Sequence, residues 1–128
     1  MDYRESFEYL LSLGNEVSAM KLGLESMTKL LRELRDPQTN YLKVQVAGTN
    51  GKGSVCAFLE SICLCADLKI SVTTSPHLVS ITERVRINGK QISQQAFAGL
   101  ATRVRDAAES LGEAGKLETV PTYFEQVT

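Results

Sequence analysis

The 128-residue chain is poor in the features that mark several specialised classes of protein. It has one histidine and three cysteines, and no apolar run approaches the length needed to span a bilayer. The cysteines, Cys56, Cys63 and Cys65, follow neither a zinc pattern nor a CxxC redox pair. We therefore expect buried apolar thiols in a reducing compartment, without a metal or catalytic role.

An excess of charge of one sign is also lacking. The net charge is −1 and there is no basic block, so binding to nucleic acid or to an anionic membrane is not predicted. The first residues carry acids and no apolar stretch of the kind found in secretory signals. With 43% hydrophobic and 23% charged residues, the chain has the composition of a globular protein, which we expect to be cytoplasmic.

What the sequence does contain is a glycine-rich loop. Residues 44–54 read Val-Gln-Val-Ala-Gly-Thr-Asn-Gly-Lys-Gly-Ser. Glycines allow backbone N–H groups to close on a phosphate, Lys52 adds a positive charge, and the Ser54 hydroxyl can face magnesium. A helix predicted after this loop would point its positive end at the anion. The pattern predicts a site for the phosphates of ATP.

The spacing of this loop differs from that of the standard P-loop. Gly48 and Gly51 are three residues apart, and an extra glycine separates Lys52 from Ser54. The alternative interpretation is a strand–turn–helix junction that uses glycine only for its backbone shape, with Lys52 in solvent.

Periodicity predicts helices over residues 3–13, 18–34, 54–66 and 93–111. Strands are predicted over 42–46 and 69–73, and a hairpin with an Asn88-Gly89 turn over 84–92. Strand, loop, helix and strand predict a right-handed βαβ unit with parallel strands. The glycine loop and Thr74–His77 would then share one sheet edge and face one site. The expected fold is α/β, the front part of a P-loop-type parallel-sheet ATPase domain.

The end of the chain carries a second motif. Thr122-Tyr123-Phe124-Glu125 fits a capping box, with Thr122 as the N-cap and Glu125 reaching back. The helix announced there is too short to be stable alone, and the predicted sheet is small for the number of helices. We therefore expect the chain to be the front of a larger domain, cut near a helix start.

Together these segments resemble folylpolyglutamate synthases and their dihydrofolate synthase relatives, which are Mur-ligase-like ATP-dependent amide ligases. The matching segments arrive in family order and cover nearly the whole chain: residues 21–25, 46–54, 74–78, 82–89 and 122–125. The resemblance implies that residues 1–128 are the N-terminal part of the ATP-binding, Mur-ligase central-type domain, without the C-terminal domain.

The resemblance also implies a mechanism. ATP would phosphorylate the carboxylate of a folate or dihydropteroate, and the amine of L-glutamate would displace the phosphate. It assigns the phosphates of ATP to Thr49, Asn50, Gly51, Lys52, Gly53 and Ser54, with Lys52 as the catalytic residue. It assigns Mg²⁺ to Ser54 and Ser75, and the pterin pocket to Thr122, Tyr123, Phe124 and Glu125. The parent enzyme would be monomeric, with only small-molecule partners.

Each implied role has a simpler alternative. Ser75, before Pro76, can be a turn residue, and His77 can cap the loop without touching a ligand. Arg84 and Arg86 are as consistent with an ion-paired strand face as with substrate contact, and Glu125 is as consistent with a helix cap as with a pterin ligand.

The family's further magnesium ligands, a glutamate and a histidine, belong downstream of residue 128, as does its modified lysine. We therefore expect no ligase turnover from this chain alone. Two other classes of function remain open. One is a non-catalytic module that binds nucleotide or pterin, and the other is a different P-loop-like enzyme, such as a kinase or a Mur-type ligase for cell-wall precursors.

Overall fold

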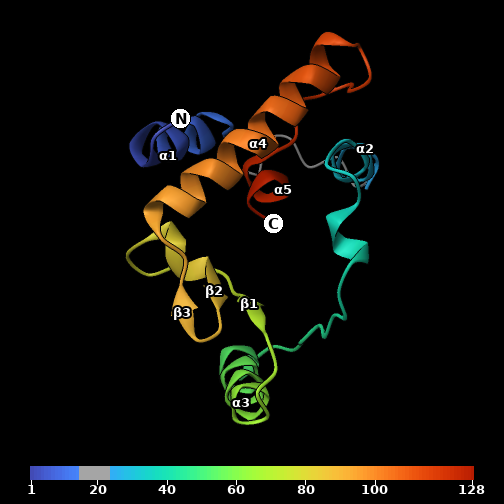
Figure 1. Ribbon diagram of the computed structural model, residues 1–128. Helices are drawn as coiled ribbons and strands as arrows, with labels where there is room; N and C mark the ends of the chain where they lie inside the picture. Colours follow the sequence, from blue (N-terminus) through green and yellow to red (C-terminus); the bar gives the residue numbers. More distant parts are fainter. Residues whose placement is uncertain (15–23) are drawn as a thin grey trace. The chain divides into compact units, whose positions relative to one another are not determined.

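The computed structural model describes residues 1–14 and 24–128, which form two compact units (Figure 1). Unit 1 comprises Met1–Leu42 and Gln95–Thr128, and unit 2 comprises Lys43–Gln94. The glycine loop and Ser75 therefore belong to unit 2, whereas the Thr122–Glu125 motif belongs to unit 1.

Unit 1 is helical. Its elements are α1 (Tyr3–Ser12), α2 (Glu25–Glu33), the 3-10 turn η2 (Pro37–Thr39), α4 (Gln94–Glu113) and α5 (Tyr123–Val127). The predicted helices over 3–13 and 93–111 are confirmed as α1 and α4. The predicted helix over 18–34 is found as α2, and its earlier part lies outside the described residues, as do residues 21–23 of the family resemblance.

The core of unit 1 lies between α2 and the C-terminal half of α4. Leu30, Ala108 and Leu111 are almost fully buried there, and four partly buried side chains pack against them: Leu34, Val104, Ala107 and Leu117. At the other end of α4, the Tyr3 ring meets the edge of Phe97 with centroids 5.9 Å apart. Burial of one apolar face is what holds a 20-residue helix of mixed polarity in place.

Unit 2 combines one helix with a small sheet. Its helix is α3 (Lys52–Cys65), its strands are β1 (Ser71–Thr73), β2 (Val85–Ile87) and β3 (Lys90–Gln91), and the 3-10 turn η3 (Ile81–Arg84) precedes β2. The predicted hairpin is confirmed, with positive φ at both Asn88 (49°) and Gly89 (78°), as a two-residue type I′ turn requires.

The predicted parallel pairing is wrong for the residues described. Their sheet has the order β1-β2-β3, and β1 pairs antiparallel with β2, with Val72 opposite Arg86. The segment over 42–46, predicted as a strand, is not one. A strand forms only where its backbone pairs with a neighbouring strand. Leu42 is 102% exposed and Val44 is 79% exposed, so neither packs closely against another described residue. The hydrophobic alternation there was real, but it has no partner strand among the described residues.

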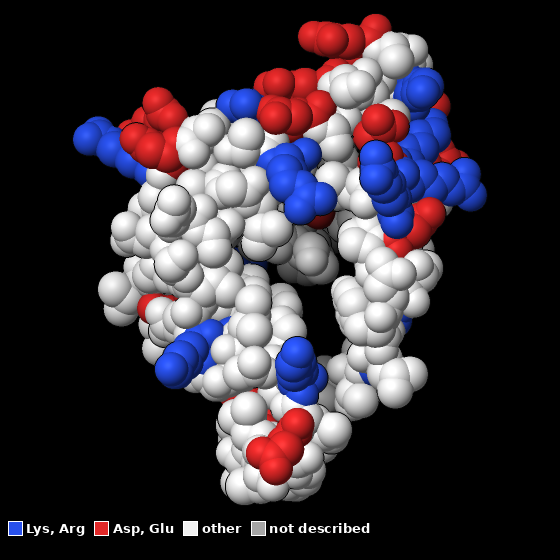
Figure 2. Space-filling model, in the orientation of Figure 1, with Lys and Arg blue, Asp and Glu red and all other residues white. Residues whose placement is uncertain are grey.

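The helix α3 is apolar but poorly buried. Val55, Phe58 and Ile62 expose 44%, 69% and 63% of their surface, although their spacing places them along one side of the helix. Figure 2 shows a contrast in surface charge. Charged side chains of both signs gather over α2 and the C-terminal part of α4, whereas the surface over α3 is mostly uncharged.

Candidate functional site

The glycine loop leads directly into α3, which begins at Lys52, two residues earlier than predicted. Gly51 is the N-cap and has φ 76° and ψ 0°, a left-handed conformation that side chains with a Cβ adopt at a cost. No side chain caps the helix, and its first backbone bond runs from Val55 N to Gly51 O at 3.0 Å. The glycine conformation thus lets the loop turn sharply onto the helix axis.

The loop leaves backbone donors facing open space. In the first turn of α3, the N–H groups of Lys52, Gly53 and Ser54 have no carbonyl four residues back within the helix. These residues are exposed, and a Cβ added to Gly51 or Gly53 would meet no atom within 4 Å. Free N–H groups at a helix start, without side chains in front of them, are the arrangement that binds anions.

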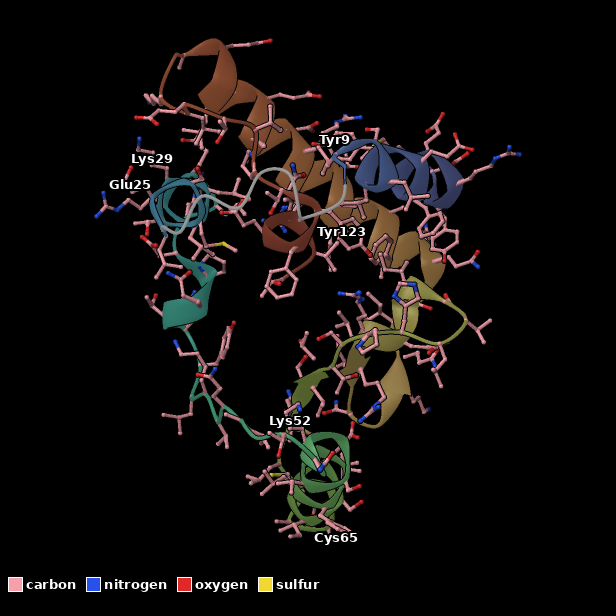
Figure 3. All side chains as sticks on the ribbon, turned by 180° about the vertical axis from the view of Figure 1, so that it is seen from behind. Tyr9, Glu25, Lys29, Lys52, Cys65 and Tyr123 are labelled. Carbon is pink, nitrogen blue, oxygen red and sulfur yellow. The ribbon has the colours of Figure 1, made fainter. Side chains whose placement is uncertain are left out.

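The Lys52 side chain bends back over this loop. Its Nζ donates to the carbonyl oxygen of Gly48 at 2.6 Å and approaches that of Thr49 at 3.4 Å. Figure 3 shows Lys52 at the N-terminal end of α3 and Cys65 at the far end. An ammonium held by carbonyls beside free N–H groups can exchange those acceptors for phosphate oxygens with little movement. Whether Lys52 binds a phosphate remains a prediction.

The Ser75 turn lies after β1 in the same unit. Ser75 is exposed, and the Ser75–Pro76 peptide bond is cis. Arg84 Nε donates to His77 Nδ1 at 3.0 Å. This contact fits a loop-holding role for His77. That Ser75 and the glycine loop share one site remains a prediction.

The Glu83 carboxylate closes the loop that follows Ser75. It accepts the backbone N–H groups of Leu78 at 2.9 Å, Val79 at 3.0 Å and Ser80 at 2.8 Å. The hydrogen bonds from Leu78 and Ser80 hold the pKa of Glu83 below its ordinary value. Glu83 is therefore an ionised anchor for the loop backbone.

The two arginines of the Arg84-Val85-Arg86 segment have different partners. Arg86 forms an ion pair with Glu60 of α3, with Nη2 and Oε2 2.7 Å apart, so the predicted ion-paired alternative is confirmed for Arg86. Only 8% of Glu60 is exposed, and the pair ties α3 to β2. Sequence reasoning missed Glu60, although an acid within an apolar helix is a signal for such a buried partner.

The Thr122–Glu125 motif forms the predicted capping box. Thr122 N donates to Glu125 Oε2 at 2.8 Å, and Glu125 N donates to Thr122 Oγ1 at 3.3 Å. The helix-cap interpretation of Glu125 is confirmed, whereas a pterin contact remains a prediction. Tyr123 is half-buried and Phe124 is 47% exposed, so the motif presents part of its aromatic surface.

The residue after this motif, Gln126, was not predicted as important. It is 7% exposed, its Nε2 donates to the Pro121 carbonyl at 3.0 Å, and its Oε1 accepts from the Tyr9 hydroxyl of α1 at 3.0 Å. Burial is the main cause that raises the pKa of Tyr9. Tyr9 and Gln126 therefore fix α5 to α1 from opposite ends of the sequence.

The remaining sequence expectations concern metals, thiols and membranes. Within the described parts of the chain, no three His, Cys, Asp or Glu side chains group as a metal site. Cys56 and Cys63, which share the helix face for which burial is expected, are half-buried, and Cys65, the last residue of α3, is exposed. Over residues 1–14 and 24–128, no helix is both long and apolar enough to cross a bilayer.

Known proteins resemble this chain both in sequence and in structure. No protein-family model matches the chain. The chain is 40% identical, over its full length, to a probable bifunctional folylpolyglutamate synthase/dihydropteroate synthase of Halobacterium salinarum, of which it covers 15%. It superimposes on the folylpolyglutamate synthetase of Lactobacillus casei with a TM-score of 0.90, at 28% identity, covering 99% of this chain and 31% of that one.

A further solved structure is Escherichia coli FolC in complex with DHPP and ADP, with a TM-score of 0.81 and 32% identity. The match covers 99% of this chain and 28% of FolC, and the chain spans only 15–26% of the length of curated relatives. The expected Mur-ligase-like fold is thereby confirmed. By sequence and by fold, the chain corresponds to a portion of the folylpolyglutamate and dihydrofolate synthases.

Proposed function

We propose that this chain supplies the nucleotide-binding loop and part of the substrate pocket of an ATP-dependent ligase, which joins L-glutamate to folate or dihydropteroate. The observation that carries the proposal is the loop geometry. Three free N–H groups at the start of α3 and the Lys52 ammonium lie together around the Gly48–Ser54 loop. This arrangement suits an anionic group such as the phosphates of ATP.

The relatives support this choice of ligand. The Escherichia coli FolC structure holds ADP and DHPP, and another neighbour is a complex of folylpolyglutamate synthase with AMPPCP and folate. We infer from these complexes that the loop over 49–54 receives the nucleotide. We infer likewise that the Thr122–Glu125 motif receives the pterin side of the substrate.

Magnesium fits this site only in company with the nucleotide. Ser54, in the first turn of α3, and Ser75, after β1, are exposed and can each offer one hydroxyl oxygen. Mg²⁺ prefers phosphate and carboxylate oxygens and keeps several waters, so the phosphates must supply the main ligands. Bound there, the ion would neutralise charge on the transferred phosphoryl group.

The residues of this chain have mainly a positioning role in the proposed reaction. The loop N–H groups hold the phosphates, and Lys52 neutralises charge that develops as the substrate carboxylate attacks the terminal phosphate. Electrostatic stabilisation by preorganised donors is the largest contribution to such transfers. Glutamate would then displace phosphate from the acyl phosphate in a step that needs residues beyond those described.

Titration of magnesium–ATP against the wild-type chain and the Lys52→Ala variant tests the proposal. A charge-assisted hydrogen bond contributes about 1.5–3 kcal/mol, so we expect about 10- to 100-fold weaker binding. Lys90→Ala is the matched control, because Lys90 is an exposed lysine of the same unit on the β2–β3 hairpin. Equal affinity of wild type and Lys52→Ala would contradict the proposal.

A further inference from the structure

Over residues 1–14 and 24–128, capping boxes completed by a glutamate are formed by Asp2 with Glu5, Ser80 with Glu83, and Thr122 with Glu125. In the first and third boxes, the glutamate accepts one backbone N–H, that of its own N-cap residue. Glu83 departs from this pattern, because it accepts two further backbone N–H groups from residues outside its box. An ordinary helix cap does not require these extra bonds.

The two extra donors are Leu78 and Val79, and their side chains do not hold the loop. Leu78 is 92% exposed and Val79 is 91% exposed, so hydrophobic burial contributes almost nothing to fixing their backbone. The turn beneath is well anchored, because Ile81 and Thr82 of η3 are 1% and 5% exposed. A buried turn thus holds one carboxylate, and that carboxylate holds an otherwise unanchored loop.

A second bond from the same turn reaches the other side of the loop. Arg84 Nε donates to His77 Nδ1 at 3.0 Å, two residues after Ser75. Glu83 and Arg84 are neighbours, so η3 contacts the loop both at His77 and at residues 78–80. The loop between Ser75 and η3 is therefore held by the side chains of two partly exposed residues, which follow directly after the buried Ile81 and Thr82.

We infer that Glu83 is a positioning residue, whose carboxylate fixes the backbone of residues 78–80 and thereby holds the Ser75–His77 turn in one orientation toward a nucleotide-bound magnesium ion. This inference rests on the proposed function, because it takes Ser75 as a magnesium ligand. It adds a role for a residue that touches neither nucleotide nor metal. The low pKa of Glu83 supports it, since an ionised carboxylate accepts three N–H groups better than a neutral one.

Glu83→Gln tests the inference because it keeps the shape of the side chain but replaces one acceptor oxygen with an NH2 donor. Glu5→Gln is the matched control, since it changes the same capping-box chemistry in unit 1. We expect faster amide hydrogen exchange at Leu78, Val79 and Ser80 in Glu83→Gln, and unchanged exchange there in Glu5→Gln. Equal exchange in the Glu83→Gln variant and wild type would overturn the inference.

The functional readout is the gain in ATP affinity that magnesium produces. Loss of a residue that supports a metal ligand costs about 10-fold or more in metal affinity, so we expect a loss of about 10-fold for magnesium–ATP. ATP affinity without the metal should stay near that of wild type. Glu5→Gln should match wild type in both measurements.

Ser75→Ala completes the experiment as a double-mutant cycle. If Glu83 acts through Ser75, the double variant loses no more magnesium-dependent affinity than Ser75→Ala alone. Additive losses would mean that Glu83 acts elsewhere and would overturn the inference. Absence of nucleotide binding by wild type would instead refute the proposed function itself, and the inference with it.

Discussion

The two units hold their candidate functional segments by different means. In unit 1, the Thr122–Glu125 motif starts a helix whose Gln126 is 7% exposed, and the neighbouring α4 buries one apolar face in a core. In unit 2, the glycine loop starts the helix α3, whose single buried residue is the charged Glu60. The helices α3 and α4 both carry many apolar residues, so composition alone does not tell which of the two is packed in a core.

The difference shows that a site can be held by packing or by polar bonds to the backbone. In unit 2, the loops are held by the Lys52 ammonium on the Gly48 carbonyl, by the Glu83 carboxylate on three N–H groups and by the bond from Arg84 to His77. Such bonds leave the loop surface free of side chains, which an anion site needs.

The largest expected effect compares two aliphatic residues in the two helices. Leu111→Ala in α4 removes a side chain that is 4% exposed, and we expect a loss of about 3 kcal/mol in the free energy of unfolding. Ile62→Ala in α3 removes one that is 63% exposed, and we expect a change within about 0.5 kcal/mol. Urea unfolding followed by circular dichroism measures both. Similar losses would mean that α3 is packed in solution.

The second comparison concerns ion pairs. Arg86→Gln leaves Glu60 charged and 8% exposed, so we expect a loss of about 2–3 kcal/mol. Arg4→Gln breaks the Arg4–Glu8 pair, whose side chains are 86% and 61% exposed, and it should leave the free energy of unfolding almost unchanged. Thermal unfolding of the two variants in parallel checks the ranking. A loss for Arg4→Gln as large as that for Arg86→Gln would contradict it.

Sequence predicted those elements whose signal is local. The Asn88-Gly89 turn, the Thr122–Glu125 capping box and the α4 helix all depend on nearby residues, and all three are found. The parallel pairing of residues 42–46 was wrong because a strand is defined by its neighbour, which no local pattern specifies.

Among candidate site residues, the glycine loop could be predicted from spacing and side-chain chemistry, although its helix starts two residues earlier than expected. The residue pairs that hold the elements around these segments could not be predicted. Tyr9 and Gln126 are 117 positions apart, and Glu60 and Arg86 are 26 apart, so their pairing appears only in the folded chain. Glu83 lay within a predicted motif, but three N–H groups on one carboxylate depend on the loop path.

The third prediction concerns the hydrogen bond between Tyr9 and Gln126. Tyr9→Phe leaves the buried Gln126 Oε1 without its donor, and we expect a loss of about 1–2 kcal/mol in unfolding free energy. Far-UV circular dichroism in urea measures it. Tyr9→Phe should also weaken pteroate binding more than ATP binding, because α5 carries the proposed pterin residues.

The pH dependence provides a check on the burial of the Tyr9 hydroxyl. The folded-state pKa of Tyr9 is raised above its ordinary value of 10.0, mainly by burial. The corresponding contribution to stability is fully present below about pH 10 and is lost as pH rises through the folded-state pKa. Wild type should therefore lose stability in alkali faster than Tyr9→Phe. Parallel curves for the two proteins would contradict the assignment.

The smallest expected effects lie in the glycine loop, where two substitutions should have opposite signs. Gly51→Ala places a Cβ on a residue with φ 76°, and we expect a loss of about 1 kcal/mol. Gly53 lies within α3 and has open space around it, so Gly53→Ala should raise stability by up to about 0.5 kcal/mol.

The two glycine variants sharpen the comparison between the units. Where a ligand is bound by backbone N–H groups, a substitution can weaken binding without lowering the stability of the fold. A Cβ at either position narrows the space in front of the N–H groups, so both variants should bind magnesium–ATP more weakly than wild type. Gly53→Ala would then be more stable yet weaker in binding, which a packing defect cannot produce. Calorimetric titration beside thermal unfolding measures both properties. Full ATP affinity in Gly53→Ala would mean that the phosphates do not approach this part of the loop.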